Sequence, residues 1–389
     1  MLILINKCNN DMFCCILTEI LHTFASIIQK FKKQNDMKIE IEKCSKSRIG
    51  EMDFSQSLPF GKYMSDHMFI CKWENGAWGT PRITPYQKLS IAPSSKVFHY
   101  GQAIFEGMKA FRDKNDKIFL FRPKDNIERF NKSAVRMNMP EFPEDLFYEA
   151  LHTLVGMDRD WVPSGEGRSY YIRPFMIGCE EALNAVPSAE YIFMIIGGPV
   201  DAIFKGEVKV KIADHFSRAA NGGTGFAKCA GNYGGQFYPS TLAKEEGYQS
   251  VIWTDDSTHT HLEEAGQMNY MMRIGDTLRT APVSDRILDG ITRRSILRLA
   301  EDMGIKTDVS PILVEEVLEA GRRGEIKEAF GCGTAAVISP ISGLGYKDTH
   351  IDIPALPDDE SFGERLRQRI FDIQYNRTED PYGWRVEVK

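Results

Sequence analysis

The feature that most constrains the fold of this chain is the apolar run YIFMIIGGPV, residues 191 to 200, and its place just before a break in the strand pattern. A continuous apolar stretch of this length is typical of a buried strand. The next segment, DAIFKGE, reads as a crossing, after which VKVKI resumes with the period-two alternation of a strand. A chain of 389 residues exceeds what one hydrophobic core usually supports, so we expect two domains joined near this crossing.

Both sides of the crossing mix strand and helix signals. HMFICKWENGAWGTPRI predicts a hairpin that turns at Asn75 and Gly76. DNIERFNKSAVRMNMP predicts a helix that begins at Asp125 or Asn126 and ends before Pro140. The other predicted helices are PEDLFYEALHTLVGM, ITRRSILRLAEDMG and VEEVLEAGRRG, and SVIWTDD and NYMMRIGDTLRTAPV predict strands.

These segments indicate an α+β fold. We expect a smaller α+β domain over residues 37–200, an interdomain loop over 201–207 and a larger α+β domain over 208–389. Residues 1–36 read as a poorly ordered appendage. Their apolar part, residues 12–28, is short for a membrane span and contains Glu19 and His22, so we expect no membrane attachment.

Charge and cysteine content exclude several classes of function. The net charge of −6 and the lack of a Lys/Arg run argue against a nucleic-acid partner. The eight cysteines form no C-x-x-C pair and no Cys/His cluster, so we predict no metal site. Scattered free thiols fit a reducing compartment, which predicts a cytoplasmic protein.

A single lysine, Lys228, lies among small residues in GFAKCAGNYGGQ, residues 225 to 236. Lone lysines are usually solvated charges, because their stems can lie along apolar surface. A buried amine would instead have a lowered pKa and could attack carbonyl groups. The stretch alone leaves both interpretations open. The neighbouring Cys229 is better explained as a small buried side chain than as a nucleophile.

Three segments could bind an anion beside a reactive lysine. Gly290 precedes a predicted helix whose first amides, those of Ile291 and Thr292, have no intrahelical partner. FGCGTAA, residues 330 to 336, predicts a tight turn with a hydroxyl at Thr334. Arg129, expected in the first turn of its helix, could offer a bidentate fork to a phosphate. Each feature alone is more often structural, whereas together with Lys228 they predict a pocket.

Two adjacent carboxylates, Glu263 and Glu264, occur in HLEEAGQMNYMM, residues 261 to 272. On a strand they face opposite ways, so only one can point inward. A solvated turn is the simpler interpretation. A buried Glu264 beside a pyridine nitrogen would instead keep that ring protonated as an electron sink.

Seven motifs in order resemble the branched-chain amino acid aminotransferases, which are pyridoxal-phosphate enzymes of fold type IV. The resemblance covers nearly everything after residue 50. The motifs are FGKYMSDHM (60–68), YGQAIFEGMKAFR (100–112), FRPKDNIERF (121–130), YYIRPFMIG (170–178), AKCAGNYGG (227–235), EAGQMN (264–269) and FGCGTAA (330–336). It implies a two-domain fold type IV architecture, pyridoxal 5'-phosphate as cofactor and a homodimer.

The resemblance also implies roles for individual residues. Lys228 would form the aldimine with the cofactor, Tyr233 would bond its phenolic oxygen, and Glu264 would pair with its pyridine nitrogen. Arg129, the amides of Ile291 and Thr292 and the Thr334 hydroxyl would hold the phosphate. The substrate carboxylate would meet Tyr100 and the amides of Thr334 and Ala335. The apolar walls around the substrate side chain would be Phe60, Phe105 and Tyr171.

The implied reaction moves the amino group of L-leucine, L-isoleucine or L-valine to 2-oxoglutarate, giving a branched 2-oxo acid and L-glutamate. The chain departs from the family pattern in three places. Ala336 and Ser339 stand where mammalian relatives carry a redox C-x-x-C, Gln267 replaces a usual threonine, and Ile203 replaces an aromatic residue in the interdomain loop. The alternatives are a D-amino acid aminotransferase or aminodeoxychorismate lyase of the same fold, and a non-enzymatic binding protein on that scaffold.

Overall fold

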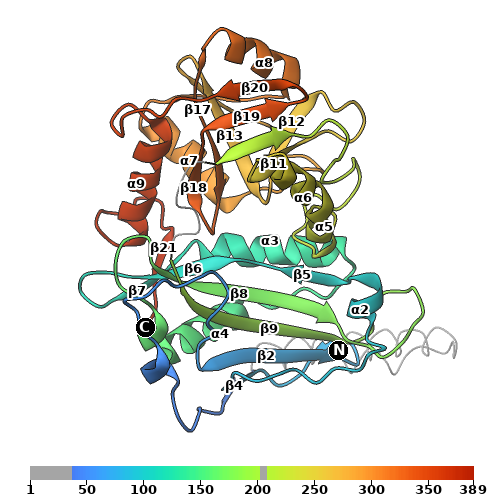
Figure 1. Ribbon diagram of the computed structural model, residues 1–389. Helices are drawn as coiled ribbons and strands as arrows, with labels where there is room; N and C mark the ends of the chain where they lie inside the picture. The colour runs from blue at the N-terminus through green and yellow to red at the C-terminus, as the bar shows by residue number, and fades with distance from the viewer. Residues whose placement is uncertain (1–36, 202–207) are drawn as a thin grey trace, which may run out of the picture.

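The computed structural model describes residues 37–201 and 208–389. They form two sheet-based layers, one above the other in Figure 1, with helices on both. Residues 1–36 and most of the expected interdomain loop, including Ile203, lie outside the described residues. None of the helices in the described ranges is long and apolar enough to cross a membrane.

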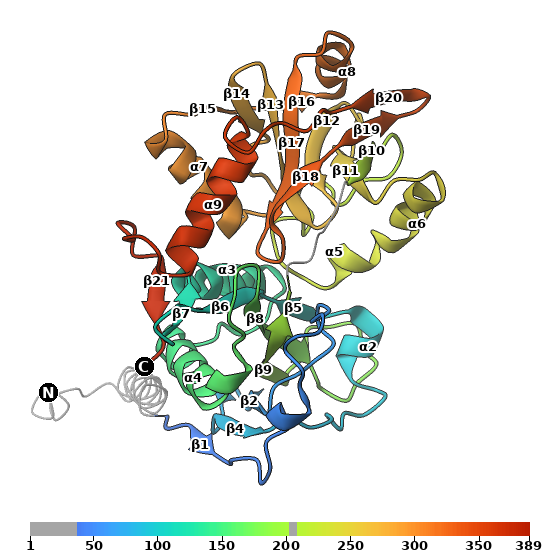
Figure 2. The same cartoon turned by 60° about the vertical axis from the view of Figure 1, so that its left-hand side comes forward.

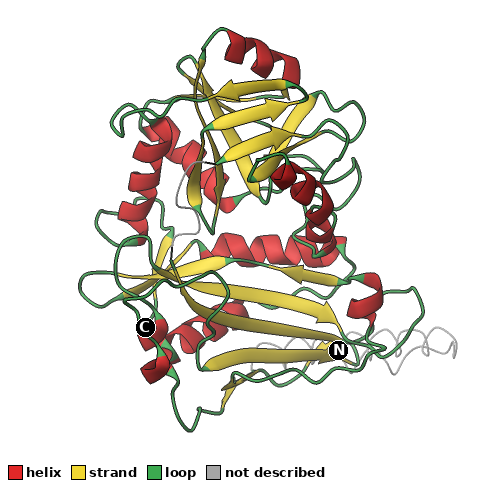
Figure 3. Cartoon of the chain, viewed as in Figure 1, coloured by secondary structure: helices red, strands yellow, loops and turns green. Residues whose placement is uncertain are grey.

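The lower layer in Figure 3 is a ten-stranded sheet. Its main strand order is β1-β4-β2-β9-β8-β6-β7-β21, with β3 paired to β2 and β5 paired to β8. The strands are β1 (Glu40–Ile41), β2 (His67–Glu74), β3 (Ala77–Trp78), β4 (Arg82–Pro85), β5 (Ala103–Phe105), β6 (Met108–Arg112), β7 (Ile118–Phe121), β8 (Ser169–Gly178), β9 (Tyr191–Val200) and β21 (Arg385–Glu387).

The predicted hairpin and the apolar run both belong to this sheet. Asn75 and Gly76 join β2 to β3 with φ values of 54° and 74°, the positive values that a type I′ turn requires. The apolar run is β9, which lies between β2 and β8 in the interior of the sheet. A charged side chain on such a buried interior strand would lose its contact with water, which explains why the residues of β9 are almost all apolar.

Two helices supply the core of the smaller domain. They are α3 (Pro123–Arg136) and α4 (Glu144–Met157), whose apolar sides pack with β2, β6 and β9 in one buried cluster. Helix α3 begins at Pro123, two residues earlier than the nearer predicted start, because proline is well tolerated in a first helical turn. Arg129 therefore lies in the second turn of α3 rather than in the first. Short helix α2 (Lys96–Tyr100) lies at one end of the sheet.

The upper layer is an eleven-stranded sheet with the main order β15-β14-β13-β12-β11-β10-β19-β20, in which β16 pairs β12 and β17 pairs β13 and β18. Its strands are β10 (Lys209–Ile212), β11 (Ser250–Thr254), β12 (His261–Ala265), β13 (Met268–Ile274), β14 (Thr277–Thr280), β15 (Lys306–Val309), β16 (Ile312–Leu313), β17 (Ile326–Gly333), β18 (Val337–Ile341), β19 (Gly343–Tyr346) and β20 (Thr349–Asp352). The helices of this part are α5 (Gly231–Gly234), α6 (Phe237–Glu245), α7 (Ile291–Asp302), α8 (Val314–Arg322) and α9 (Phe362–Gln374).

The C-terminus corrects the expected domain boundary. After α9 the chain returns to the smaller domain, where β21 pairs antiparallel with β7, as Figure 2 shows at the left. The larger domain therefore does not extend to residue 389. A third buried cluster, which includes Phe111 of β6, Phe330 of β17 and Trp384, packs side chains from both domains together at this junction.

Candidate active site

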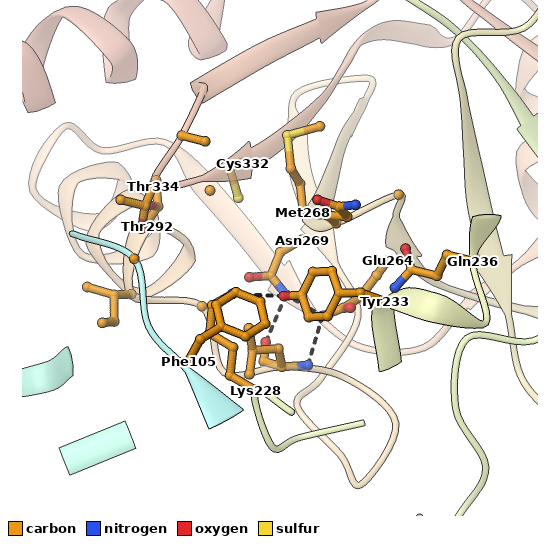
Figure 4. A pocket seen from close by; sticks show the side chains of 18 of the residues that line it. Phe105, Lys228, Tyr233, Gln236, Glu264, Met268, Asn269, Thr292, Cys332 and Thr334 are labelled. Carbon is orange, nitrogen blue, oxygen red and sulfur yellow. Dashed lines mark hydrogen bonds between the residues drawn. The ribbon is translucent and has the colours of Figure 1, made fainter. Parts of the chain in front are cut away.

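A cavity of about 400 Å³ lies between the two layers and collects most of the predicted site residues. Its volume is within the range of small-molecule sites. Figure 4 shows the side chains around it. The predicted residues that line it are Phe60, Phe105, Arg129, Tyr171, Lys228, Tyr233, Glu264, Ile291, Thr292, Thr334 and Ala335. No group of three His, Cys, Asp or Glu side chains in the described ranges is placed to hold a metal ion.

The lysine segment is fixed against the smaller domain by backbone contacts. The Lys228 carbonyl accepts a hydrogen bond from the Phe105 amide at 3.0 Å, and the Ala230 amide donates to the Ala103 carbonyl at 3.0 Å. The Lys228 amide donates to Ser133 Oγ of α3 at 2.9 Å. The segment also packs closely on the larger domain, since a Cβ on Gly225 would lie 2.5 Å from the Arg286 carbonyl oxygen. The lysine backbone therefore sits at the boundary of the two domains.

The Lys228 side chain is half-buried and faces two aromatic rings. Its Nζ donates to the Tyr233 hydroxyl at 2.9 Å and lies 4.9 Å from the centroid of the Phe105 ring. The rings of Phe105 and Tyr233 are themselves in contact, at 4.8 Å between centroids. The structure thus places the amine at the wall of the cavity, beside two aromatic rings, rather than on the outer surface of the protein.

Glu264 lies deeper in the same cavity and is 2% exposed. Its Oε2 is 2.9 Å from Arg218 Nε, and its Oε1 accepts hydrogen bonds from the Leu288 amide at 2.8 Å and from Asn269 Nδ2 at 3.1 Å. Burial raises the pKa of Glu264, and the charge of Arg218 opposes that rise. The neighbouring Glu263 does not line the cavity and pairs with Arg286 instead, as expected for adjacent strand residues.

Unpaired backbone amides face the opposite end of the cavity. Gly290 caps α7, and the amides of Ile291 and Thr292 make no hydrogen bond to any described residue. The same holds for the amides of Thr334 and Ala335 in the turn between β17 and β18. A helix N-terminus next to a turn with free amides is a favourable place for an anion.

Arg129 reaches this end of the cavity, but its fork is already occupied. Its Nε and Nη2 donate to the two carboxylate oxygens of Glu106 at 2.7 and 2.9 Å, and its Nη1 donates to the Asp289 carbonyl at 3.0 Å. Glu106 is fully buried, so the pair is a bidentate ion pair shielded from water. These contacts use three of the five N–H donors of Arg129, so a phosphate contact would have to use the two that remain.

The apolar side of the cavity carries one further cation. Phe60 packs edge-on against Tyr171 at 4.7 Å, and the Arg173 guanidinium lies 4.6 Å from the Phe105 ring centroid. Arg173 Nη2 donates to the Tyr171 hydroxyl at 3.0 Å, while its buried Nε has no hydrogen-bond partner in the described part of the chain.

Tyr100 is the one predicted site residue that the structure does not bring to the cavity of its own chain. It is 44% exposed at the end of α2, and its hydroxyl donates to the Leu183 carbonyl. Gly101 adopts a left-handed conformation and ends α2, so Tyr100 lies before the chain enters β5. The contact that fixes its side chain is with Leu183, which is 83 residues away in sequence.

Two charged residues that line the cavity, Arg173 and Arg218, were not predicted as site residues, and neither was Glu106, which pairs with Arg129 beside it. Glu106 lies within the motif YGQAIFEGMKAFR and Arg173 within YYIRPFMIG, so the sequence contained both without indicating their partners. Arg218 lies outside every motif. An ion pair of Arg218 with Glu264 joins residues that are far apart in sequence, and only the folded chain reveals it.

Comparisons with known proteins agree with one another. A family model described as amino-transferase class IV matches residues 103–344. The branched-chain-amino-acid transaminase 1 of Bacillus subtilis (strain 168) is 42% identical over 340 residues, which cover 85% of this chain and 94% of that protein. A probable branched-chain-amino-acid aminotransferase of Staphylococcus epidermidis (strain ATCC 12228 / FDA PCI 1200) is 39% identical over 360 residues, covering 90% of this chain and 98% of that one.

Solved structures show the same fold. A branched-chain aminotransferase from Thermoproteus uzoniensis with norvaline matches with a TM-score of 0.68 and 22% identity, covering 82% of this chain and all of that chain. A branched-chain amino acid aminotransferase from Thermobaculum terrenum, in its PLP-bound holo-form, matches with a TM-score of 0.66 and 19% identity. The match covers 86% of this chain and 100% of that chain.

Proposed function

The chain belongs to the class IV aminotransferases, in the group of the branched-chain-amino-acid transaminases, and from this premise we propose how its cavity carries out their reaction. The enzyme transfers the amino group of L-leucine, L-isoleucine or L-valine to 2-oxoglutarate, with pyridoxal 5'-phosphate as cofactor. The observation that carries the proposal is that the Lys228 amine donates a hydrogen bond to Tyr233 in a cavity that is also lined by the buried Glu264. These three positions support the roles that the resemblance implies for Lys228, Tyr233 and Glu264.

The charges of the cavity suit a ligand with several negative groups. Glu106 and Glu264 are each matched by an arginine, whereas Lys228 and Arg173 have no carboxylate within ion-pair distance among the described residues. Free amides at the start of α7 and in the turn after β17 add anion-binding capacity. We propose that the amides of Ile291 and Thr292 and the Thr334 hydroxyl hold the cofactor phosphate. The amides of Thr334 and Ala335 would instead receive the substrate carboxylate, and Arg129 would contribute its charge and the N–H donors that Glu106 and Asp289 leave free.

When bound, pyridoxal phosphate supplies an aldehyde that takes up the amino group and a ring that withdraws electrons from the substrate Cα. Lys228 would hold the cofactor between turnovers. Once an amino acid frees it, its Nζ would take the proton from the substrate Cα and deliver a proton on the way to the 2-oxo acid. Its hydrogen bond to Tyr233 would keep the amine directed into the cavity rather than toward solvent.

Glu264 would keep a pyridine nitrogen protonated. A carboxylate that stays charged while buried needs compensation. The Leu288 amide and Asn269 Nδ2 donate hydrogen bonds to Glu264, and Arg218 supplies a positive charge 2.9 Å away. We therefore propose that Arg218 acts through Glu264 by stabilising its negative charge. The charge of Glu264 is most valuable when electrons move from the substrate into the ring, so its contribution belongs to the transition state.

Phe60, Phe105 and Tyr171 would contact the branched side chain. An apolar pocket separates side chains that differ by one methylene by only about 1 to 3 kcal/mol, so leucine, isoleucine and valine should all react. Glutamate must enter the same pocket with a second carboxylate. Arg173, whose buried Nε lacks a partner in the described part, is the group that could receive it.

We further propose a homodimer that works in the cytoplasm. Exposed apolar side chains gather near α2 and the loop after β8, namely Phe98, Tyr100, Leu183 and Val186. Burying such a patch against a second copy would remove it from water. Tyr100 could then meet a substrate carboxylate only in the cavity of the partner, because it lies outside the cavity of its own chain.

The direct test is a steady-state assay of the purified protein. With L-leucine and 2-oxoglutarate, we expect L-glutamate and the branched 2-oxo acid to form in equal amounts. D-alanine should be inactive as the amino donor. Turnover of D-alanine without turnover of L-leucine would instead assign the chain to a D-amino acid aminotransferase.

A further inference from the structure

Lys109 is a buried lysine that has no role in the reaction proposed above. It lies on β6, is 5% exposed, and its Nζ makes one hydrogen bond, to the Ala335 carbonyl at 2.7 Å. That bond joins the smaller domain to the turn between β17 and β18, 226 residues away in sequence. Burial lowers the pKa of Lys109 to about 8. No described carboxylate lies within ion-pair distance of it.

Packing alone does not explain a lysine at this position. The small cavity beside it is lined by apolar and uncharged side chains, including Phe111, Phe121, Asn126 and Gln374. A buried ammonium with one acceptor loses more hydration than a single hydrogen bond returns. A methionine of similar size would fill the same space without that cost. Lys109 therefore lowers the stability of the fold, which points to a function.

The turn that Lys109 contacts is strained. Val337, which directly follows the turn, has φ of 63°, a conformation that β-branched residues avoid. Such a backbone persists only where surrounding contacts hold it. The pairing of Gly333 with Val337 closes the turn at its base, whereas the amides of Thr334 and Ala335 have no hydrogen-bond partner in the described chain. The hydrogen bond from Lys109 to the Ala335 carbonyl fixes the peptide group between Ala335 and Ala336. This peptide group directly follows the two unpaired amides.

We propose that Lys109 is a positioning residue that holds the strained turn in its anion-binding form and places a positive charge behind the amides of Thr334 and Ala335. The substrate carboxylate would meet those amides under the proposed function, on which this inference rests. Lys109 touches neither substrate nor cofactor. Its removal should therefore weaken the binding of carboxylates while leaving the fold intact or more stable.

The test compares K109M with wild type and with K114M, which changes an exposed lysine on the same β6–β7 hairpin. The probe is 4-methylvalerate, which has the carboxylate and side chain of leucine but no amine to react. Its affinity for the cofactor-loaded protein is measured from the change in absorption, alongside melting temperature and KM and kcat for L-leucine. We expect about a tenfold weaker affinity for K109M and a parallel rise in KM, equal to about 1.4 kcal/mol. The melting temperature should be unchanged or higher, and K114M should match wild type.

The proposal is overturned if the affinity for 4-methylvalerate changes less than about threefold, a difference below about 0.7 kcal/mol. It is also overturned if K109M is insoluble or melts well below wild type, because the lysine would then be structural. Wild-type protein that binds 4-methylvalerate but does not transaminate L-leucine would refute the proposed function instead. The two failures are thus distinguishable.

Discussion

Among single residues, the adjacent glutamates Glu263 and Glu264 have different roles, one structural and one in the cavity. Glu264 faces the cavity, whereas Glu263 pairs with Arg286 away from it. We expect Glu264→Gln to lower kcat by about a hundredfold or more, the loss typical of removing a preorganised charge. Cofactor affinity should fall much less, since the charge acts mainly in the transition state. Steady-state kinetics and cofactor titration measure both quantities.

The control for this change is Glu263→Gln, which removes the same charge one residue away. It breaks a partly buried ion pair and lowers stability, but we expect kcat per cofactor-loaded subunit to stay within about twofold of wild type. Equal losses in the two variants would mean that the assignment of the inward-facing carboxylate is wrong.

The Glu106–Arg129 pair makes a pH-dependent contribution to stability. Burial alone would raise the pKa of Glu106, but the charge and hydrogen bonds of Arg129 lower it overall from its usual 4.5. A carboxyl whose pKa is lowered by folding stabilises the protein above 4.5, and this stabilisation is lost as pH falls through the lowered value. Removing one partner of a buried pair costs about 3 kcal/mol or more at neutral pH.

Glu106→Gln should therefore melt well below wild type at neutral pH, and the difference should narrow as pH falls below 4.5. It should also bind pyridoxal phosphate more weakly, because Arg129 would lose the partner that orients it. Glu128→Gln, at a partly exposed position on α3, the helix that carries Arg129, is the matched control. A melting difference that stays constant down to acid pH would contradict the ion-pair account.

Among the secondary-structure elements, α7 begins directly after Gly290, a position where only glycine fits. A Cβ on Gly290 would overlap the side-chain oxygen of Asn269. The side-chain nitrogen of the same asparagine donates hydrogen bonds to Glu264 and to the Leu288 carbonyl. Gly290→Ala should therefore disturb both the helix N-terminus and the Glu264 end of the cavity. We expect about a tenfold weaker cofactor affinity, or about 1.4 kcal/mol. Gly50→Ala, where a Cβ meets no atom within 4 Å, should leave the affinity unchanged.

Elements with local signals could be predicted from the sequence. The Asn75-Gly76 turn requires positive φ at both residues, and asparagine and glycine supply it without help from distant contacts. The motifs also located Lys228, Glu264 and the α7 N-terminus correctly within one cavity. What could not be predicted depends on pairing across the fold. The return of β21 to β7, the occupied fork of Arg129 and the outward position of Tyr100 have no local signature.

At the scale of the whole molecule, Tyr100 links the oligomeric state to catalysis. If it serves the cavity of a partner, a subunit that lacks Lys228 can still supply Tyr100 to a neighbour. We expect K228A to be inactive and Y100A to be strongly impaired when each is alone. Co-expressed in equal amounts, they should recover about a quarter of wild-type activity, since half of the dimers are mixed and each mixed dimer has one complete site.

Activity of the mixture that equals the average of the two separate variants would contradict a shared site. Sedimentation of wild type at working concentration provides the matching structural control, and a monomer with full activity would leave Tyr100 without the role that the motifs imply.

The absorption spectrum of the purified protein with pyridoxal phosphate, recorded before and after L-leucine is added, shows whether Lys228 binds the cofactor and whether L-leucine reacts with it. We predict a visible band from cofactor bound to Lys228, which L-leucine converts to the band of the aminated cofactor and 2-oxoglutarate restores. The band should be absent or altered in K228A. A wild-type spectrum that L-leucine leaves unchanged, with or without a later response to D-alanine, would contradict the assignment of this cavity to branched-chain amino acid transamination.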